Sequence, residues 1–392
     1  MGRVLVRTLP LHGNYGNILQ AWALQQSLTR LGLSTFVDVS ISTEKGRRRW
    51  PYAKDLVKRA LLTLGVSHPY WIRYVRGGVD AALQDFVARR IDVARLYVAP
   101  GKCDLKLLEH VDAFLVGSDQ VWRRPYGDVG SYLLNFLTDD DRRPKIAYAA
   151  SFGRNDLEEY SPALLADSRR LAQRFDAVSV RESSGVRLAD EYWDVRALQH
   201  VDPTLLIEPA EYLAISKEAS DTFPTGRLVD YVLDDEVETR RLVAQIATAL
   251  DEVPISLMPP PPPTSYREFR RNSERYRKPS IGAWIGAISG ARFVVTDSFH
   301  GTVFSIIHNV PFVAVANRDR GAARFESLLE TFGLRSRLVY PGESAPLAEV
   351  TTDIDWEYVN SRIAAEQRRS FAYLRRTLNQ INNTAAEPAH QS

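Results

Sequence analysis

The sequence predicts an α/β protein that is built on parallel sheets and divided into two domains. Two stretches, Arg3–Val39 and Arg292–Ala316, each read as a strand, a polar turn with glycine, a helix and a second strand. In such βαβ units the two strands are parallel and the helix covers one face of the sheet. The chain has 392 residues, which is long for one hydrophobic core and indicates two domains of about 150–200 residues.

The composition is that of an ordinary globular protein, with 45% hydrophobic and 25% charged residues. A formal net charge of +2 gives no support to nucleic-acid binding. The single cysteine, Cys103, excludes an internal disulfide framework and is typical of a reducing cytoplasm. The N-terminal apolar run is too short for a signal peptide, and no apolar run could span a membrane. We therefore expect a cytoplasmic protein.

The first βαβ unit opens with a strand over Arg3–Thr8 and the polar loop LHGNYGN. A helix is predicted over Ile18–Leu31, because its apolar residues fall on one face and Gly32 follows it. The loop has GxxG spacing, which differs from the GxGxxG fingerprint of dinucleotide-binding sheets. Three of its side chains could hydrogen-bond a ligand, or could belong to a plain tight turn: Asn14, Tyr15 and Asn17.

The segment Glu44–Leu64 combines seven Lys and Arg residues with apolar and aromatic ones. At helical spacing the cations form one face and the apolar residues the other. A solvated face over an ordinary core stripe has this pattern, and so does a helix that lies on anionic lipid. A peripheral membrane contact through Lys45–Leu64 is therefore the alternative, and it matters if the substrate is lipid-linked.

A strand predicted over Asp112–Val116 ends in small and polar residues, as loops at the carboxyl edge of a sheet often do. These residues could orient a hydroxyl-bearing substrate or cap the turn: Ser118, Asp119 and Gln120. Arg181 follows a later strand, predicted over Asp176–Val180. A guanidinium there can hold a carboxylate or phosphate by two hydrogen bonds. The alternative is a surface pair with Glu182.

We divide the chain into an N-terminal domain over 1–209, a C-terminal domain over 210–355, a helix over 356–382 that packs back on the body, and a flexible tail over 383–392. His200–Pro209 is predicted to be the last strand and the exit of the first domain. The second domain is predicted from these elements: strands Arg227–Leu233 and Pro254–Leu257, and helices Glu236–Asp251 and Ser280–Gly290.

The turn of the second βαβ unit is the most informative stretch. A buried strand over Arg292–Thr296 runs into Asp297, Ser298 and His300, and a helix is predicted over Thr302–His308. Ligands of open parallel sheets lie beyond the carboxyl ends of the strands. The free N–H groups of a helix N-terminus there are suited to holding phosphate, and we assign this role to Ser298, Gly301 and Thr302.

These residues indicate transfer from a small phosphorylated donor to a hydroxyl, with His300 as acid and base. A structural histidine is the alternative, but a position after a buried strand favours function. The seven histidines and one cysteine show no metal-ligand spacing. No metal or other cofactor is expected. The chain also has no nucleophile elbow and no P-loop lysine.

Six blocks in order resemble the polysaccharide pyruvyltransferase family: LPLHGNYGNILQAWALQ, FLVGSDQVW, YAASFG, VSVRE, VDPTLL and VTDSFHGTVFSIIHNVPF. They run from Leu9 to Pro311, and RGAARFESLLETFGL (Arg320–Leu334) is a further match. The resemblance implies two Rossmann-like domains that face each other across a cleft, a GT-B-like arrangement, with the active site in the cleft.

The resemblance also implies phosphoenolpyruvate as donor and a glycan or lipid-linked saccharide as acceptor in cell-envelope polysaccharide biosynthesis. The products would be a pyruvate ketal and phosphate. His300 matches the family's catalytic histidine and Arg181 its donor-binding arginine. We assign the acceptor side to the N-terminal domain, which contributes Arg181, and the donor side to the C-terminal domain, which contributes His300. A later basic residue that contacts phosphate in the family corresponds here to one of Arg318, Arg320 and Arg324.

Two other functions are compatible with the sequence. A GT-B glycosyltransferase with a nucleotide-sugar donor is the main alternative, because a fold does not fix the chemistry. A non-catalytic module that binds glycan or a lipid surface is the second, and the basic segment Lys45–Arg59 is the argument for it.

Overall fold

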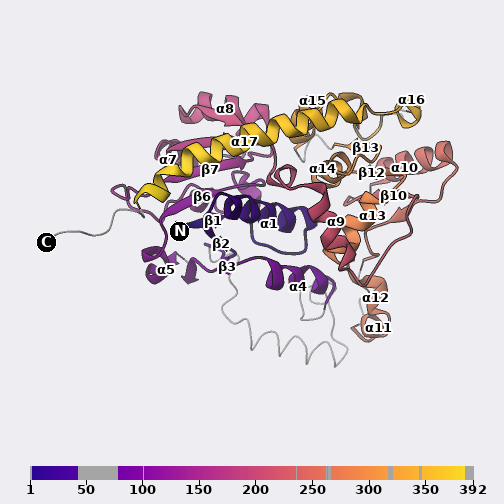
Figure 1. Cartoon of the computed structure of the whole chain (residues 1–392), viewed down its shortest axis with the longest axis horizontal. Coiled ribbons are helices and arrows are strands. Elements are labelled where there is room, and N and C mark those ends of the chain that lie inside the picture. The colour runs from indigo at the N-terminus through magenta and orange to yellow at the C-terminus, as the bar shows by residue number, and fades with distance from the viewer. Residues whose placement is uncertain are drawn as a thin grey trace.

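The computed structural model describes residues 2–42, 78–99, 101–234, 236–261, 263, 266–316, 321–343 and 347–384. Two parallel sheets with helices on their faces lie side by side, one built from the first half of the chain and one from the second (Figure 1). This confirms the predicted α/β fold with two Rossmann-like domains. The sheets occupy residues 3–199 and 228–339, on either side of the predicted boundary at position 209.

The first sheet has seven strands, and every printed pairing between neighbours is parallel. Their spatial order is β3 (Val93–Ala94), β2 (Ser34–Asp38), β1 (Arg3–Arg7), β6 (Ala113–Val116), β7 (Lys145–Ala150), β8 (Ala177–Val180) and β9 (Ala197–Gln199). The direction of winding reverses between β1 and β6. In doubly wound sheets the ligand crevice opens at such a reversal, beyond the carboxyl ends of the strands.

The second sheet is smaller and is also parallel. Its order is β11 (Ile255–Ser256), β10 (Leu228–Tyr231), β12 (Phe293–Thr296), β13 (Phe312–Val315) and β14 (Leu338–Val339). Here the winding reverses between β10 and β12. Each half of the molecule therefore has its own switch point, the place where the strand order reverses. The first predicted βαβ unit supplies β1 beside one switch point, and the second supplies β12 beside the other.

Helices cover both sheets. In the first half they are α1 (Tyr15–Arg30), α4 (Ala81–Arg90), α5 (Leu105–Glu109), α6 (Val129–Tyr132), α7 (Pro162–Ala172) and α8 (Ser183–Trp193), with the 3₁₀ turns η2 (Arg124–Tyr126) and η3 (Pro203–Leu206) and the small ribbon β4 (Tyr97–Ala99) and β5 (Lys102–Cys103). Beyond them come α9 (Pro209–Lys217), α10 (Val237–Leu250), α11 (Tyr266–Arg271), α12 (Ser273–Tyr276), α13 (Ile281–Ser289), α14 (Phe299–Ile307), α15 (Ala322–Thr331), η5 (Arg335–Arg337), α16 (Leu347–Thr351) and α17 (Trp356–Thr384).

Because of side-chain caps, two helices begin three residues earlier in the sequence than predicted. α1 begins at Tyr15 because the Asn14 side chain accepts the Asn17 N–H at 3.1 Å. α14 begins at Phe299, three residues before the predicted start, because Ser298 Oγ accepts the Gly301 N–H at 3.3 Å. Both loops are therefore shorter than the sequence suggested, and His300 lies in the first turn of a helix.

The strand predicted over His200–Pro209 is wrong. The last strand of the first sheet, β9, ends at Gln199, and the 3₁₀ turn η3 occupies the middle of the predicted segment. Pro203 has no N–H to give to a strand ladder. The Asp202 side chain instead accepts the Thr204 N–H at 3.0 Å and so starts the turn.

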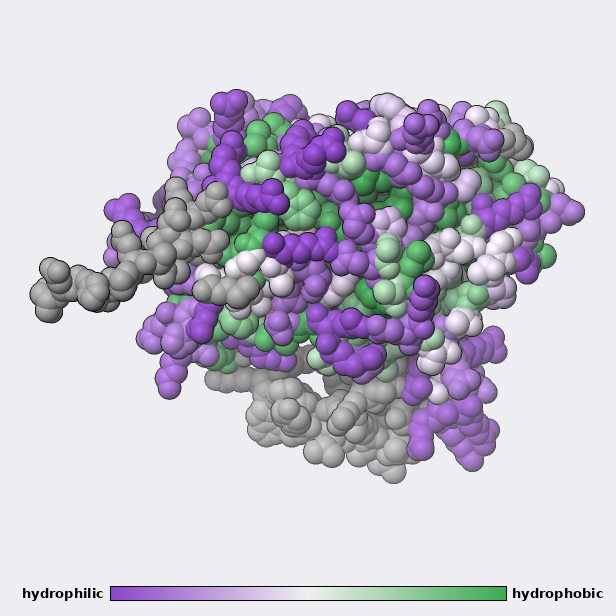
Figure 2. All heavy atoms as spheres, viewed as in Figure 1, coloured by the Kyte–Doolittle hydropathy of each residue, from purple (hydrophilic) through white to green (hydrophobic). Residues whose placement is uncertain are grey.

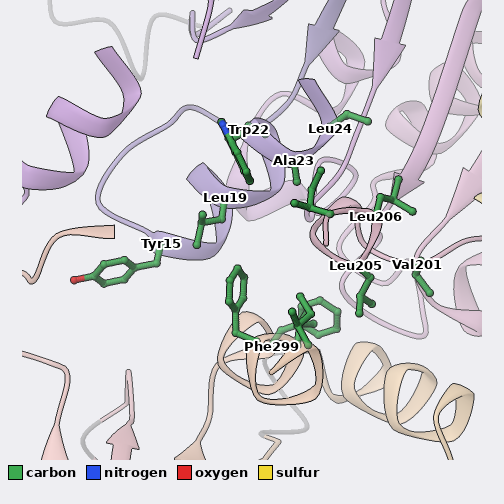
Figure 3. Packing of buried hydrophobic residues seen from close by; sticks show 14 of the residues in the cluster. Tyr15, Leu19, Trp22, Ala23, Leu24, Val201, Leu205, Leu206 and Phe299 are labelled. Atoms are coloured by element: carbon green, nitrogen blue, oxygen red, sulfur yellow. The ribbon is translucent and has the colours of Figure 1, made fainter. Parts of the chain in front are cut away.

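α1 lies between the two halves and packs on both. Its apolar residues and those of the segment 201–206 surround Phe299 of α14 in one cluster that also includes residues of both sheets (Figure 3). The Tyr15 ring stacks on Trp284 of α13 with 5.1 Å between ring centroids, and its hydroxyl donates to the Pro279 carbonyl oxygen at 2.8 Å. The two halves therefore share a hydrophobic core beneath the cleft.

The last helix, α17, runs along both halves, from the side of α15 back to the first sheet (Figure 1). Gln367 Nε2 donates to the Leu205 carbonyl oxygen at 2.9 Å, and the Tyr373 hydroxyl donates to that of Ala147 at 2.9 Å. Hydrophilic residues predominate on this face (Figure 2). Among the described residues, no helix combines the length and apolarity that crossing a bilayer requires. The basic segment Lys45–Leu64 and the end of the predicted tail, from 385, lie outside the described residues.

Candidate active site

A cavity of about 450 Å³ opens between the two sheets. Its walls are formed chiefly by the loops that follow β1, β6, β10 and β12. These are the strands on either side of the two reversals in strand order, so both switch points face the same space. The geometry places most of the predicted site loops around one cavity, although they lie far apart in the sequence.

His300 lines this cavity from the first turn of α14 and is 6% exposed. Its Nε2 lies 3.4 Å from Oδ2 of Asp202, a residue of the other half of the molecule. On the Nδ1 side the ring approaches Gly16 of α1, where an added Cβ would lie 2.0 Å from Nδ1. The histidine is therefore held between two elements of the first half.

The close approach explains why glycine stands at position 16. A methyl group there would collide with the imidazole, and overpacking of this kind costs about 1–3 kcal/mol. We expect Gly16→Ala to lower the free energy of unfolding by about this amount and to reduce activity, because the His300 ring must move. Gly286→Ala in α13 is a matched control, since its Cβ would meet only the hydroxyl of Ser216 closely. Denaturant unfolding of both variants checks this, and equal losses would contradict it.

Arg181 extends from the end of β8 and is 4% exposed. It does not line the cavity of His300 itself, but lines a narrow second pocket together with Asp202 and Phe299, and Phe299 belongs to both. Its Nη1 donates to Asp202 Oδ2 at 2.7 Å, and its Cζ lies 4.4 Å from the centroid of the Phe299 ring. Burial acts to lower the pKa of Arg181, but Asp202, Asp119 and Glu182 together raise it. Within the described part of the chain, Nε and Nη2 have no hydrogen-bond partner. Nη2 lies 3.6 Å from Asp119 Oδ1, within ion-pair distance, so Nε is the donor of Arg181 with neither a hydrogen-bond nor an ion-pair partner among the described residues.

The alternative for Arg181, a surface pair with Glu182, is wrong because both side chains are buried. Glu182 Oε1 accepts hydrogen bonds from the Ser151 hydroxyl at 3.0 Å and from the N–H groups of Phe152 and Gly153 at 2.7 and 3.2 Å. Burial raises the pKa of Glu182. This carboxyl group therefore holds the loop after β7 in place.

Arg324 of α15 is the second cation of the site and lines the cavity. Its Cζ lies 5.5 Å from the centroid of the same Phe299 ring. Burial and the nearby charge of Arg181 lower the pKa of Arg324 to about 10, so both arginines are charged at neutral pH. Two buried guanidinium groups over one ring form a site for a ligand with two negative charges. Arg318 and Arg320 lie outside the described residues.

The prediction that free N–H groups of Gly301 and Thr302 hold phosphate is wrong. The Gly301 N–H donates to Ser298 Oγ at 3.3 Å, and the Thr302 N–H donates to the Ser298 carbonyl oxygen at 3.0 Å. Because α14 starts earlier than predicted, these two groups already belong to its hydrogen-bonded first turns. Ser298 itself lines the cavity, while the Thr302 side chain is buried away from solvent.

The predicted acceptor loops reach the cavity only in part. Four of the six predicted residues line it: Asn14, Asn17, Asp119 and Gln120. The other two are corrected by the structure. Tyr15 is packed between the halves with its hydroxyl on Pro279, and Ser118 is fully buried with its hydroxyl 3.2 Å from Asp202 Oδ2.

Two acidic residues of the site were not predicted. Asp202 is one, and the only sequence signal for it was the block VDPTLL. Asp297 is the other; it lines the cavity and accepts the N–H groups of Leu233 and Asp234 at 2.7 and 2.8 Å. Burial raises the pKa of Asp297 to about 7, although the hydrogen bond from the Leu233 N–H acts to lower it. No group of three or more potential ligand residues in the described ranges could hold a metal ion.

Two facing Rossmann-like domains with a site between them define a protein of the GT-B class. A family model for polysaccharide pyruvyl transferase matches residues 14–320, and the chain belongs to that family. The family assignment makes the protein a transferase. No curated protein sequence matches this one.

Solved structures are similar in fold at low identity. The UDP-GlcNAc 2-epimerase of Neisseria meningitidis bound to UDP-GlcNAc is 10% identical with a TM-score of 0.50, over 97% of this chain and 100% of that one. A UDP-glucosyltransferase from Polygonum tinctorium is 13% identical with a TM-score of 0.48, over 96% and 98%. The Methanocaldococcus jannaschii UDP-GlcNAc 2-epimerase is 12% identical with a TM-score of 0.47, over 97% and 100%. Such likeness concerns the fold alone.

Proposed function

We propose that the protein transfers the pyruvyl group of phosphoenolpyruvate to two hydroxyls of a glycan, forming a pyruvate ketal and releasing phosphate. The observation that carries the proposal is the pair of buried arginines, Arg181 and Arg324, over one ring, that of Phe299. Arg324 and Phe299 line the cavity that His300 lines, and Arg181 lines a narrow second pocket that shares Phe299 with it. Membership of the pyruvyl transferase family supports it.

The donor, phosphoenolpyruvate, carries a carboxylate and a phosphate that are both attached to C2. Nε and Nη2 of Arg181 have no hydrogen-bond partner among the described residues and form the fork that matches a carboxylate, and Nη2 also lies 3.6 Å from Asp119 Oδ1. Arg324 takes the phosphate, a role that the N–H groups of Gly301 and Thr302 cannot fill. The two ligand charges are then each paired with a guanidinium, which is what a buried anion requires.

The chemistry follows from this placement. His300 gives a proton to the methylene carbon of phosphoenolpyruvate, which becomes a methyl group and leaves a cationic centre at C2. An acceptor hydroxyl attacks C2 and loses its proton to His300. Phosphate then leaves with its bonding electrons, the second hydroxyl closes the ketal, and its proton goes to the phosphate. Acid and base help of this kind contributes roughly 10²–10⁴-fold.

The acceptor would lie against the first half of the cavity. Asn14, Asn17, Asp119 and Gln120 offer amide and carboxylate groups there, which suit the hydroxyls of a saccharide. A lipid-linked saccharide fits the same requirement, because only its sugar end has to enter the cavity.

A GT-B glycosyltransferase with a nucleotide-sugar donor is the alternative. The wall from the second half carries three carboxyl groups, those of Asp234, Glu236 and Asp297. Both donors are anionic and would meet these groups, so membership of the pyruvyl transferase family, and not the charge of the wall, favours the pyruvyl donor.

The proposal is tested by incubating the protein with phosphoenolpyruvate and a panel of saccharides, both free and lipid-linked. We expect phosphate release that depends on acceptor, and a pyruvate ketal on the glycan by mass spectrometry. A parallel panel with UDP-sugars measures the alternative. Nucleoside diphosphate release with glycosylated product, and no ketal, would contradict the proposal.

A further inference from the structure

Asp202 is the buried carboxylate at which the two halves of the site meet. It follows β9, and its side chain has no exposed surface. We propose that Asp202 is a positioning residue that fixes the tautomer of His300 and also orients Arg181. The proton donor, His300, and the anion-binding group, Arg181, can then act on the same ligand. The inference rests on the proposed function for its kinetic consequence, but its structural content can be measured without turnover.

The two oxygens of Asp202 have different tasks. Oδ1 is anchored within η3, where it accepts the Thr204 N–H at 3.0 Å and the Thr204 hydroxyl at 2.7 Å. Oδ2 faces the site, where it lies 2.7 Å from Arg181 Nη1, 3.2 Å from Ser118 Oγ and 3.4 Å from His300 Nε2. Because the hydrogen bonds to Oδ1 fix the carboxylate, Oδ2 has a fixed position and can position the groups that contact it.

The charge of Asp202 decides which nitrogen of His300 carries a proton. Burial acts to raise the pKa of Asp202, but His300, Arg181 and the Thr204 N–H hold it far below its ordinary value. The group is therefore an ionised carboxylate, which only accepts hydrogen bonds. A ring nitrogen that faces it must carry hydrogen, so neutral His300 is the Nε2–H tautomer.

The other ring nitrogen, Nδ1, then exchanges the reacting proton. Nδ1 lies on the side of Gly16, and residues flanking Gly16 in the sequence, Asn14 and Asn17, line the cavity. The distance of 3.4 Å from Nε2 to Oδ2 is long for a hydrogen bond, and such contacts commonly tighten when a ligand binds. Arg181 and Asp202 belong to one half and His300 to the other, so the contact also links the two halves at the reacting centre.

Asp202→Asn is the kinetic test. An amide that offers N–H to Nε2 favours the wrong tautomer of His300, and we expect kcat to fall on the order of 10²–10⁴-fold. The KM for phosphoenolpyruvate should rise as well, because the same amide N–H would face Nη1 of Arg181, which now donates to Oδ2. Tyr212→Phe is the control, because it removes only the hydrogen bond from the Tyr212 hydroxyl to the Thr204 carbonyl oxygen, 2.9 Å long, in the same turn. Equal kcat in wild type and Asp202→Asn, or an equal loss in Tyr212→Phe, would overturn the inference.

Nitrogen NMR of the wild-type protein tests the tautomer directly and does not require the variant to fold. The signals of His300 are assigned by their absence in His300→Gln, and we expect protonated Nε2 and unprotonated Nδ1 at a pH at which the ring is neutral. The opposite tautomer would overturn the inference. If the expected tautomer is seen but phosphoenolpyruvate is not turned over, the proposed function fails and the positioning role of Asp202 stands.

Discussion

Replacing His300 with glutamine is expected to reduce kcat for pyruvyl transfer by roughly 10²–10⁴-fold, the range that acid and base catalysis contributes. Glutamine keeps an amide N–H that can face Asp202, but it cannot exchange a proton with the methylene carbon of the donor. Because the arginines are untouched, the affinity for phosphoenolpyruvate should stay within a few-fold of wild type. Steady-state phosphate release with a saturating acceptor measures both quantities.

His308→Gln is the matched control for this variant. His308 lies directly after the same helix, α14, and lines a different cavity, so its loss should leave kcat unchanged. Burial lowers the pKa of His308 to about 4, which keeps its ring neutral in the assay. Full activity of His300→Gln, or an equal loss in both variants, would contradict the assignment of His300.

Replacing Arg181 with lysine is expected to raise the KM for phosphoenolpyruvate by about 10–10²-fold, since a hydrogen bond to a charged group contributes about 1.5–3 kcal/mol. Lysine keeps the charge beside Asp202 but loses the planar fork whose Nε and Nη2 have no hydrogen-bond partner among the described residues. Alanine is a poorer test. It would leave the buried Asp202 carboxylate without its cation, which costs about 3–5 kcal/mol of stability.

The control for Arg181 is Arg187→Lys on α8. The Arg187 side chain is 55% exposed and pairs with Glu191 on the surface of the helix, so the change should leave KM within experimental error. An unchanged KM in Arg181→Lys would remove this arginine from the donor site. A thermal melt of each variant separates lost binding from lost folding.

The sequence predicted the fold class and the edge of the sheets at which the site lies, because both depend on local patterns. Runs of β-branched residues indicate buried strands, and polar turns after these strands indicate the carboxyl edge of the sheet. His300 and Arg181 follow such strands, and the structure brings them to one carboxylate. The register of the helix starts depends on side-chain caps, which is why the phosphate role of Gly301 and Thr302 was misassigned.

The rest of the site depends on contacts between distant segments. Asp202 reads as part of a strand in the sequence, and only the meeting of η3, β8 and α14 makes it the centre of the site. Tyr15 reads as a loop residue, yet it packs on Trp284 across the two halves. No periodicity in the chain encodes which residues of the first half face which residues of the second.

The central claim is that phosphoenolpyruvate binds between the halves on Arg181 and Arg324, and calorimetric titration tests it most directly. We predict one binding site per chain for phosphoenolpyruvate in wild type, an affinity at least tenfold weaker in Arg324→Gln, and no binding of UDP-glucose under the same conditions. Absence of phosphoenolpyruvate binding to the wild-type protein, or binding to Arg324→Gln and Arg181→Lys that is as tight as to wild type, would contradict this claim.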